Sequence, residues 1–243
     1  MIKTRFAQFA LLAGLAVVSA TAAHASVSTS YTVSKTILNQ PVSYTTPVTL
    51  AQFNPTLGTL QSVVLSITGT ESAVVTVQNS NLTAQAFTNA TAAVPVSITG
   101  PSGLVASSIV TAGPFSGTVP AAVVYSLPAP FPPTVTVNGT ISSAPLTGTS
   151  PTGMANVAPA DFHFYVGTGL STISLSFTAL QASFGGSANP GVYFGGNASA
   201  GALVSITYTY LPSMTVVPEP ATFVALASGL VCLGLVRLRR KAA

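Results

Sequence analysis

Apolar side chains recur at every second position in several segments of the chain, a pattern typical of half-buried β-strands. The clearest alternation occurs in four segments, residues 27–37, 63–67, 173–177 and 204–210. Ser and Thr fill most of the intervening positions, so each strand is predicted to have one apolar face and one hydroxyl-bearing face. Gly69-Thr70 follows the second segment and predicts a turn, after which Val75 and Val77 resume the alternation.

Helical periodicity is weak over the same part of the chain. No stretch between residues 26 and 211 carries a helical apolar stripe longer than about two turns. Residues 81–93 are compatible with a short helix, but their Thr and Asn content favours a strand or loop equally. We therefore predict an all-β fold over residues 26–211, a single antiparallel β-sandwich of jelly-roll or immunoglobulin-like type.

Gly, Pro and Asn divide the predicted strands. Asn138-Gly139 predicts a hairpin turn, and Gly185-Gly186 and Gly195-Gly196 are predicted to bracket a loop. Residues 127–133 (LPAPFPP) cannot be a central strand and predict an extended surface crossing. The strand pattern stops at Leu211. Aromatic side chains supply the predicted core, whose candidates are Phe53, Phe87, Phe115, Phe162, Phe164 and Phe177.

Charge is scarce and unevenly placed. Of 243 residues, 7 are Lys or Arg and 3 are Asp or Glu, so 4% are charged, against about 25% in an average soluble domain. Between residues 26 and 211 only Lys35, Glu71 and Asp161 are charged, so the net charge of +4 belongs to the two ends. This distribution excludes a nucleic-acid-binding surface, and a single cysteine excludes an intrachain disulfide.

The N-terminus, residues 1–25, has the pattern of a secretory signal peptide. Lys3 and Arg5 precede an apolar run over residues 9–18, which at about ten residues is too short for a permanent membrane span. Ala23 and Ala25 are the small residues that such a cleavage site requires, and cleavage is expected before Ser26. We expect export through the Sec translocon across an inner membrane.

The C-terminal segment, residues 212–243, begins with a tether and contains a short motif, an apolar run and a basic tail. The motif is Val217, Pro218, Glu219, Pro220 and Ala221. Residues 221–236 predict a membrane helix about 24 Å long, which spans hydrocarbon only marginally. The tail, residues 237–243, is predicted to stay cytoplasmic because of its basic residues, Arg237, Arg239, Arg240 and Lys241.

The Pro-Glu-Pro motif at residues 218–220, the helix and the basic tail together resemble the PEP-CTERM sorting signal of Gram-negative bacteria. The resemblance implies processing by an exosortase, a membrane-embedded transpeptidase-like enzyme that removes the tail and passes the protein to the cell surface or extracellular matrix. A plain C-terminal membrane anchor is the alternative. Cys232 lies within the predicted helix and is most simply a small apolar residue there.

The central region also resembles a family. The segments QFNPTLGTLQSVVLSITGT (52–70), DFHFYVGTGLSTISLSFTA (161–179) and VSITYTY (204–210) are similar to the choice-of-anchor E domains of secreted bacterial proteins. The resemblance covers about residues 30–210. It implies a structural domain that is followed by one of several anchors, and it carries over no catalytic residue.

Candidate chemistry in the central region is sparse. Asp161 and His163 are two apart, so on a strand they would share a side and could form a dyad or half of a metal site. A triad needs an activated nucleophile, no GxSxG motif occurs, and only Glu71 could add a third ligand. We favour a capping or solvated pair, a solvent-facing Glu71, and Lys35 as an edge or snorkelling lysine. No catalytic residue, metal ligand or cofactor is therefore assigned.

Neutral polar groups must cover the exported domain. Four glycosylation-type sequons begin at Asn81, Asn89, Asn138 and Asn197, a number that chance explains in so Asn-, Ser- and Thr-rich a chain. We expect a non-enzymatic surface or matrix protein associated with exopolysaccharide in a biofilm. The alternatives are a carbohydrate-binding module that stacks sugars on Tyr193 and Phe194, and a self-assembling adhesin.

Overall fold

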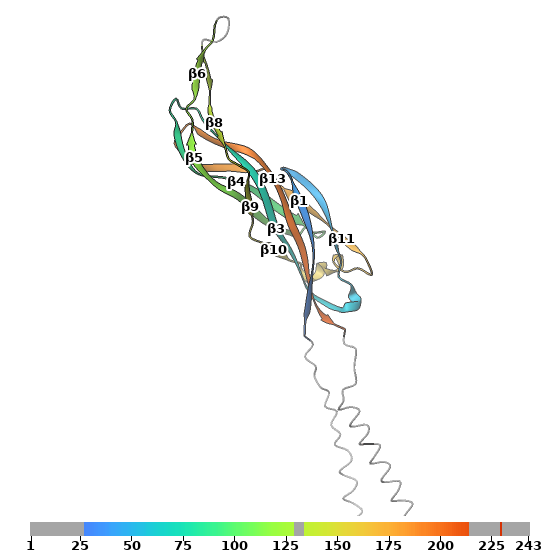
Figure 1. The fold of residues 1–243 in the computed structure, drawn as a ribbon. Coiled ribbons are helices and arrows are strands. Elements are labelled where there is room, and N and C mark those ends of the chain that lie inside the picture. The colour runs from blue at the N-terminus through green and yellow to red at the C-terminus, as the bar shows by residue number, and fades with distance from the viewer. Residues whose placement is uncertain (1–26, 129–133, 214–228, 230–243) are drawn as a thin grey trace, which may run out of the picture.

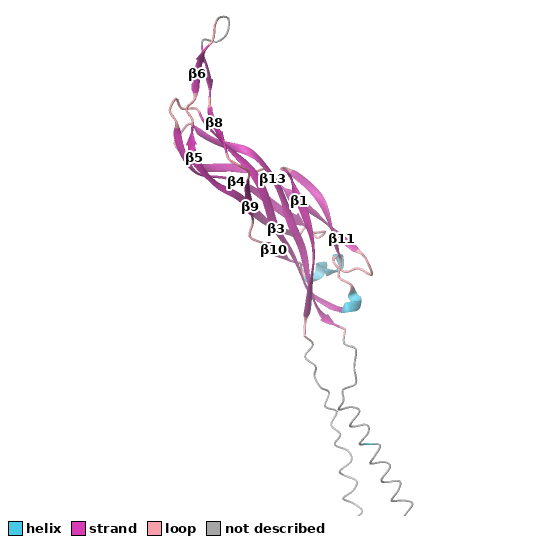
Figure 2. Ribbon diagram, in the orientation of Figure 1, coloured by secondary structure: helices cyan, strands magenta, loops and turns pink. Residues whose placement is uncertain are grey.

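The computed structural model describes residues 27–128, 134–213 and 229, and the predicted signal peptide, sorting motif, membrane helix and basic tail lie outside them. The described chain is almost entirely β-structure, with two short 3-10 helices, Pro55–Leu57 and Pro159–Phe164 (Figure 2). Two antiparallel sheets face each other in an elongated sandwich, and the described chain enters and leaves at the same end (Figure 1). The predicted all-β sandwich is confirmed at this level.

The first sheet is built around two very long strands. β3 (Gly58–Asn79) pairs along one edge with β13 (Val192–Pro212), which in turn pairs with β1 (Thr29–Pro41). The other edge of β3 pairs with three short strands in succession, β8 (Gly139–Ser142), β9 (Leu146–Thr149) and β10 (Gly153–Asn156).

The second sheet is built around β4 (Gln85–Thr99). One edge of β4 pairs with β5 (Val105–Val119). The other edge pairs directly with two strands at successive places along its length, β11 (Thr172–Ala179) and β12 (Ser183–Ala188). β2 (Tyr44–Ala51) completes the sheet beside β11. A separate two-stranded ribbon, β6 (Val123–Ser126) and β7 (Thr134–Val137), projects from the end of the sandwich opposite the termini of the described chain (Figure 1).

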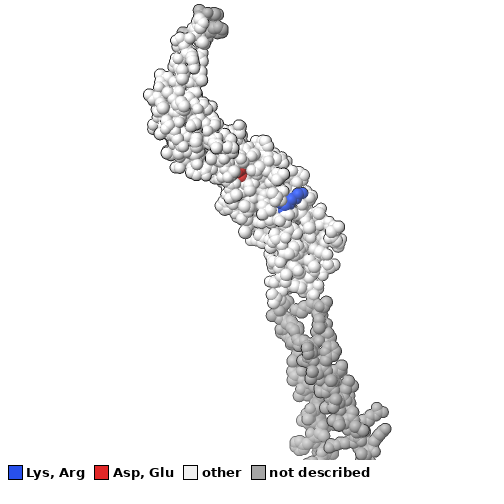
Figure 3. Space-filling view, in the orientation of Figure 1, with Lys and Arg blue, Asp and Glu red and all other residues white. Residues whose placement is uncertain are grey.

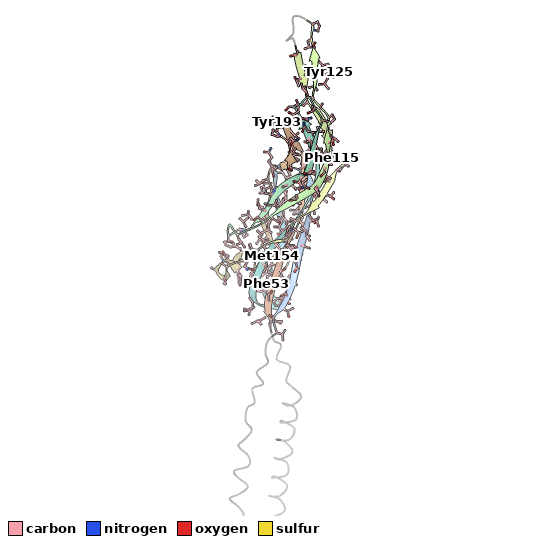
Figure 4. The ribbon with its side chains drawn as sticks, turned by 90° about the vertical axis from the view of Figure 1, so that its left-hand side faces the viewer. Phe53, Phe115, Tyr125, Met154 and Tyr193 are labelled. Atoms are coloured by element: carbon pink, nitrogen blue, oxygen red, sulfur yellow. The ribbon has the colours of Figure 1, made fainter. Side chains whose placement is uncertain are left out.

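The alternation in the sequence places one residue in two inside the sandwich. In β3 the inward side chains from Val63 to Val77 are buried, whereas their neighbours are only partly covered. The buried apolar residues form two clusters, a larger one that contains Phe53 and Phe177 and a smaller one that contains Phe87. Full burial of such side chains contributes about 1.5–3 kcal/mol each. Phe53 lies in the half of the sandwich away from the ribbon (Figure 4).

Two tyrosine hydroxyls connect the sheets. Tyr208 of the first sheet donates a hydrogen bond to the carbonyl of Ala51 in the second, at 3.0 Å. Tyr44 of the second sheet donates in the opposite direction, to the carbonyl of Ala200 at 2.7 Å. Each of these two hydroxyls is the polar end of an otherwise apolar ring and finds a backbone acceptor on the facing sheet, whereas the buried hydroxyl of Tyr165 makes no well-formed hydrogen bond.

Serines fill the gaps between the short strands along β3. Gly69 N–H donates to Ser150 Oγ at 2.8 Å, and Val75 N–H donates to Ser143 Oγ at 3.1 Å. The N–H of each serine donates back to the carbonyl of the same β3 residue. An unpaired buried N–H would lower the stability of the fold by about 1–3 kcal/mol. The two serine hydroxyls accept hydrogen bonds from the β3 N–H groups in the gaps, so three short strands can replace one continuous neighbour of β3.

Each of the three short strands also contributes a glycine. These are Gly139, Gly148 and Gly153, whose added Cβ atoms would lie 2.0, 2.1 and 2.0 Å from the carbonyl oxygens of Pro120, Thr111 and Ser107. Any side chain at these positions would collide with the backbone in or just after β5. The glycines therefore let the two sheets approach along this side of the sandwich.

Two turn predictions are wrong. Gly69-Thr70 is not a turn, because β3 runs on through it and a Cβ on Gly69 would meet the side chains of Val96 and Val110. Asn138 does not form a hairpin with Gly139, because β7 pairs with β6 while β8 pairs with β3. The loop predicted between the glycine pairs at 185–186 and 195–196 is present at residues 189–191, and the pairs themselves lie in the flanking strands β12 and β13.

The structure also tests the predictions for residues 81–93, the end of the last strand and the aromatic core. Residues 81–93 form a loop and then the start of β4, not a helix, and β13 ends at Pro212, one residue beyond the predicted end. Of the predicted extended segment 127–133, only Leu127 and Pro128 are described, directly after β6, and residues 129–133 lie outside the described residues. Among the core candidates, Phe164 is wrong because it is 39% exposed, and Phe115 and Phe162 are partly buried against the clusters.

Candidate functional site

The outer face of the first sheet is a regular array of hydroxyl groups. Cross-strand neighbours on β1, β13 and β3 bring serines and threonines into rows, one of which contains Ser34, Ser205 and Ser66. Hydroxyls of adjacent strands hydrogen-bond to each other at 2.8 Å between Thr32 and Thr207, and other pairs repeat this contact. Rows are about 7 Å apart along a strand, and neighbouring hydroxyls about 5 Å apart across strands.

The outer face of the second sheet has the same character. One row crosses four strands through Thr45, Thr178, Ser97 and Ser107, and the first two hydroxyls lie 3.1 Å apart. Each hydroxyl can donate one hydrogen bond and accept two, so most retain capacity after pairing with a neighbour. Both broad faces can therefore form many weak, neutral hydrogen bonds with a partner rich in hydroxyls.

Charge contributes almost nothing to these faces. Figure 3 shows a surface on which nearly all described residues are neither acidic nor basic. Lys35 is exposed on β1, which lies at the edge of its sheet, so the expectation of an edge lysine is confirmed. Without charge, long-range attraction of an ionic ligand is weak, and contact has to depend on hydrogen bonding and shape.

An open groove of about 690 Å³ lies where β1 ends and β13 continues without a partner on that side. Its lining combines amides, hydroxyls and a ring, among them Gln181, Asn197, Ser72, Ser199 and Phe184. Amides and hydroxyls beside an aromatic ring are the groups that bind uncharged sugars. This groove is therefore a candidate ligand site.

The predicted sugar platform is only half correct. Tyr193 is 59% exposed on the outer side of β13, where a ring could stack on a sugar. Phe194 points to the other side of the strand, with its ring 6.3 Å from Phe87, and packs against the smaller core cluster. The two rings therefore cannot form one stacking surface. The sequence does not predict that Gln181 and Phe184 line a groove, because no sequence motif marks a groove that forms where a neighbouring strand ends.

Asp161 and His163 do not form a dyad. They lie in the 3-10 helix Pro159–Phe164 rather than on a strand, so the predicted shared face does not exist. His163 Nδ1 lies 2.9 Å from the carbonyl of Ala160, and its ring lies against Phe164. Among the described residues, no three side chains of the metal-binding types gather closely enough to hold an ion.

Glu71 is buried, contrary to the expectation of a solvent-facing side chain. It occupies an inward position of β3 and is 2% exposed, in line with the buried Gly69 before it and Ala73 after it. Neither carboxylate oxygen makes a well-formed hydrogen bond. Burial raises the pKa of Glu71 to about 7, and the nearby backbone of Ala112 offsets this rise only in part.

The sorting residues lie outside the described part of the chain, so the structure places none of Val217, Pro218, Glu219, Pro220 and Ala221. The basic cluster from Arg237 to Lys241 and the signal cleavage site around Ala25 lie outside it as well. Among the residues that the structure does describe, no helix has the length and apolar character to cross a membrane.

Comparison with known proteins gives no family. No protein-family model and no curated protein matches the chain. A structure of infectious bursal disease virus, Gt strain, is similar over 87% of this chain and 48% of that chain, at 10% identity and a TM-score of 0.12. A crystal structure of the T13 viral particle of the same virus is similar over 87% of this chain and 47% of that chain, at 9% identity and a TM-score of 0.08. This chain spans about half the length of either, and at such scores neither carries an argument.

Proposed function

We propose that this chain is a non-enzymatic, exported protein of the cell surface or extracellular matrix, processed by an exosortase and associated with exopolysaccharide. The observation that carries the proposal is a hydroxyl-covered, almost uncharged β-sandwich between two export signals. In this proposal residues 1–25 form a cleaved signal helix and residues 221–236 a transient membrane helix.

The surface chemistry supports a matrix role. Both broad faces present neutral hydroxyl rows, and a polysaccharide presents hydroxyls in return. A hydrogen bond between the protein and a polysaccharide replaces hydrogen bonds to water, so each one contributes little to the binding free energy. Affinity must therefore come from the number of contacts along an extended partner. The fold also brings the start and the end of the described chain to one end, which leaves both faces accessible when that end is tethered.

Processing is tested by replacing Pro218, Glu219 and Pro220 together with alanine in the native host. The expected result is a protein that keeps its C-terminal tail, visible by mass spectrometry as a mass larger by the tail. Pro212→Ala, outside the motif, is the matched control and should be processed normally. An unchanged mature mass for the triple variant would contradict the role of the motif.

A carbohydrate-binding function is the second candidate, and the groove at the end of β1 favours it. Asn197→Ala combined with Gln181→Ala removes two amides from the lining and is expected to lower retention on the host's exopolysaccharide about fivefold or more. Gln61→Ala removes an exposed amide of β3 outside that lining and should leave retention unchanged. Equal retention of all three proteins would exclude the groove as the binding site.

A further inference from the structure

The ribbon formed by β6 and β7 has one apolar face that nothing in the described structure covers. Its register pairs Val123 with Val137 and Tyr125 with Val135. Since alternate residues of a strand share a face, these four side chains lie together on one side. The opposite side carries Val124 with three hydroxyl residues, so the ribbon is amphipathic in the way of a half-buried pair of strands.

This apolar face is exposed to solvent. Its four side chains are between 40 and 52% exposed, and every residue of both strands is exposed. Neither core cluster includes a residue of the ribbon. Figure 4 shows Tyr125 on the projecting end, away from both sheets. An isolated two-stranded ribbon is marginally stable in water, and an apolar sheet face is normally buried against a second layer.

The chemistry of the ribbon restricts what that second layer can be. Both outer edges are free, because β6 and β7 pair only with each other among the described strands. A free edge entering lipid would leave backbone N–H and C=O groups unsatisfied, at several kcal/mol each, which disfavours a membrane. Three of the four side chains are valines, which cannot stack on sugar rings as an aromatic does, and residues 120–138 contain no charge for an ionic partner.

A second copy of the same chain fits all of these features. We propose that the apolar face of the ribbon docks against the same face of a second molecule, related to the first by a two-fold axis. Such an isologous contact brings Val123, Tyr125, Val135 and Val137 of both copies together as two layers of a small sandwich. The free edges stay in water, where their backbone groups remain hydrated.

The position of the ribbon gives this contact a direction. The ribbon lies at the opposite end of the sandwich from the start of β1 and the end of β13, where the described chain begins and ends (Figure 1). With the two-fold axis perpendicular to the long axis of the ribbon, two copies joined through their ribbons extend end to end and their chain termini point apart. If the proposed function holds and the chain is displayed on a surface, this contact joins molecules on two facing surfaces.

The size of the face predicts a weak contact between single molecules. The four side chains expose on the order of 350 Å² per copy, or about 700 Å² for a pair, below the roughly 1,200 Å² of a stable complex. Many copies on one surface compensate, because simultaneous contacts multiply the apparent affinity. The contact is therefore expected to be detectable when molecules are displayed at high density.

The test uses the full chain, coupled to beads at high density through its C-terminus. Wild-type beads should aggregate with one another, and V135T combined with V137T should slow aggregation at least tenfold. V124T is the matched control: it makes the same change on the opposite face of the same ribbon and should alter the rate less than twofold. Threonine keeps the branched shape of valine and the ribbon contributes nothing to the core, so far-ultraviolet circular dichroism should be unchanged.

Three results would overturn the proposal: dispersed wild-type beads, equal aggregation of the wild type and the double variant, or an equal loss with V124T. Binding of wild-type beads to phosphatidylcholine vesicles, lost in the double variant without any bead aggregation, would assign the face to lipid instead. Because the assay uses purified chain, its outcome is independent of whether exosortase processing occurs.

Discussion

Glu71 makes the stability of the sandwich depend on pH. Its carboxyl group is buried between the two core clusters without a well-formed hydrogen bond, and its pKa is about 7 in the folded protein against 4.5 for an unperturbed glutamic acid. Below about pH 4.5 the group is protonated in both the folded and unfolded chains and costs nothing. As pH rises from 4.5 to 7, the unfolded chain loses its proton first, so the free energy of unfolding falls.

Replacement of Glu71 by glutamine keeps the shape of the side chain and removes its ionisation. Because the pKa rises from 4.5 to about 7 on folding, and allowing for local relaxation and water entry, we expect the free energy of unfolding to increase by about 2–3 kcal/mol at pH 8. The variant should match the wild type at pH 4 and exceed it by this amount at pH 8. The difference should develop between pH 4.5 and 7 and stay constant above.

Urea unfolding of residues 26–213 at pH 4, 5, 6, 7 and 8, followed by tyrosine fluorescence, measures this difference. Asp161→Asn controls for the loss of one carboxylate, because that side chain is partly exposed in the 3-10 helix. Parallel curves for the wild type and Glu71→Gln across this range would refute the reasoning, since they would show that the buried carboxyl does not change its proton affinity on folding.

Three further substitutions, one of them with a control variant, test the packing. Gly148→Ala places a Cβ 2.1 Å from a backbone oxygen and should lower the free energy of unfolding by about 1–3 kcal/mol, whereas Gly195→Ala, with open space around it, should cost well under 1 kcal/mol in the same urea titration. Ser150→Ala leaves the buried N–H of Gly69 without its acceptor and should cost about 1–3 kcal/mol, with faster amide exchange at that N–H. Tyr208→Phe removes one hydrogen bond between the sheets and should cost about 0.5–1.5 kcal/mol, measured by thermal unfolding.

The strands could be predicted from the sequence because, in a half-buried strand, apolar residues occupy every second position, on the side that is buried. Residues 29–37 of the first predicted segment lie within β1, residues 173–177 lie within β11, and the all-β sandwich is confirmed. Turns were harder to predict, because glycine serves two purposes. Gly69 and Gly139 have no side chain because neighbouring atoms occupy that space, whereas the same residue in a turn supplies an unusual backbone angle. Local sequence does not distinguish these causes.

The candidate sites show the same limit. The hydroxyl character of the surface follows from composition and alternation alone, and the structure arranges it in rows. The groove, the buried Glu71 and the exposed face of the ribbon depend on which strands are neighbours. Gln181 and Asn197 are far apart in the sequence, and only the end of β1 at Pro41 creates the groove that both line. Long-range pairing of this kind leaves no local pattern.

The long pairing of β13 with β3, which one register shift between Thr209 and Tyr210 interrupts, has a mechanical consequence. Their register extends from Pro212 opposite Gly58 to Val192 opposite Asn79, along most of the length of the sandwich. If a molecule is held at Ser213 and pulled at its ribbon, tension acts parallel to these strands and perpendicular to the hydrogen bonds between them. The bonds are then loaded together in shear rather than broken one after another, so this geometry favours resistance to stretching along the long axis.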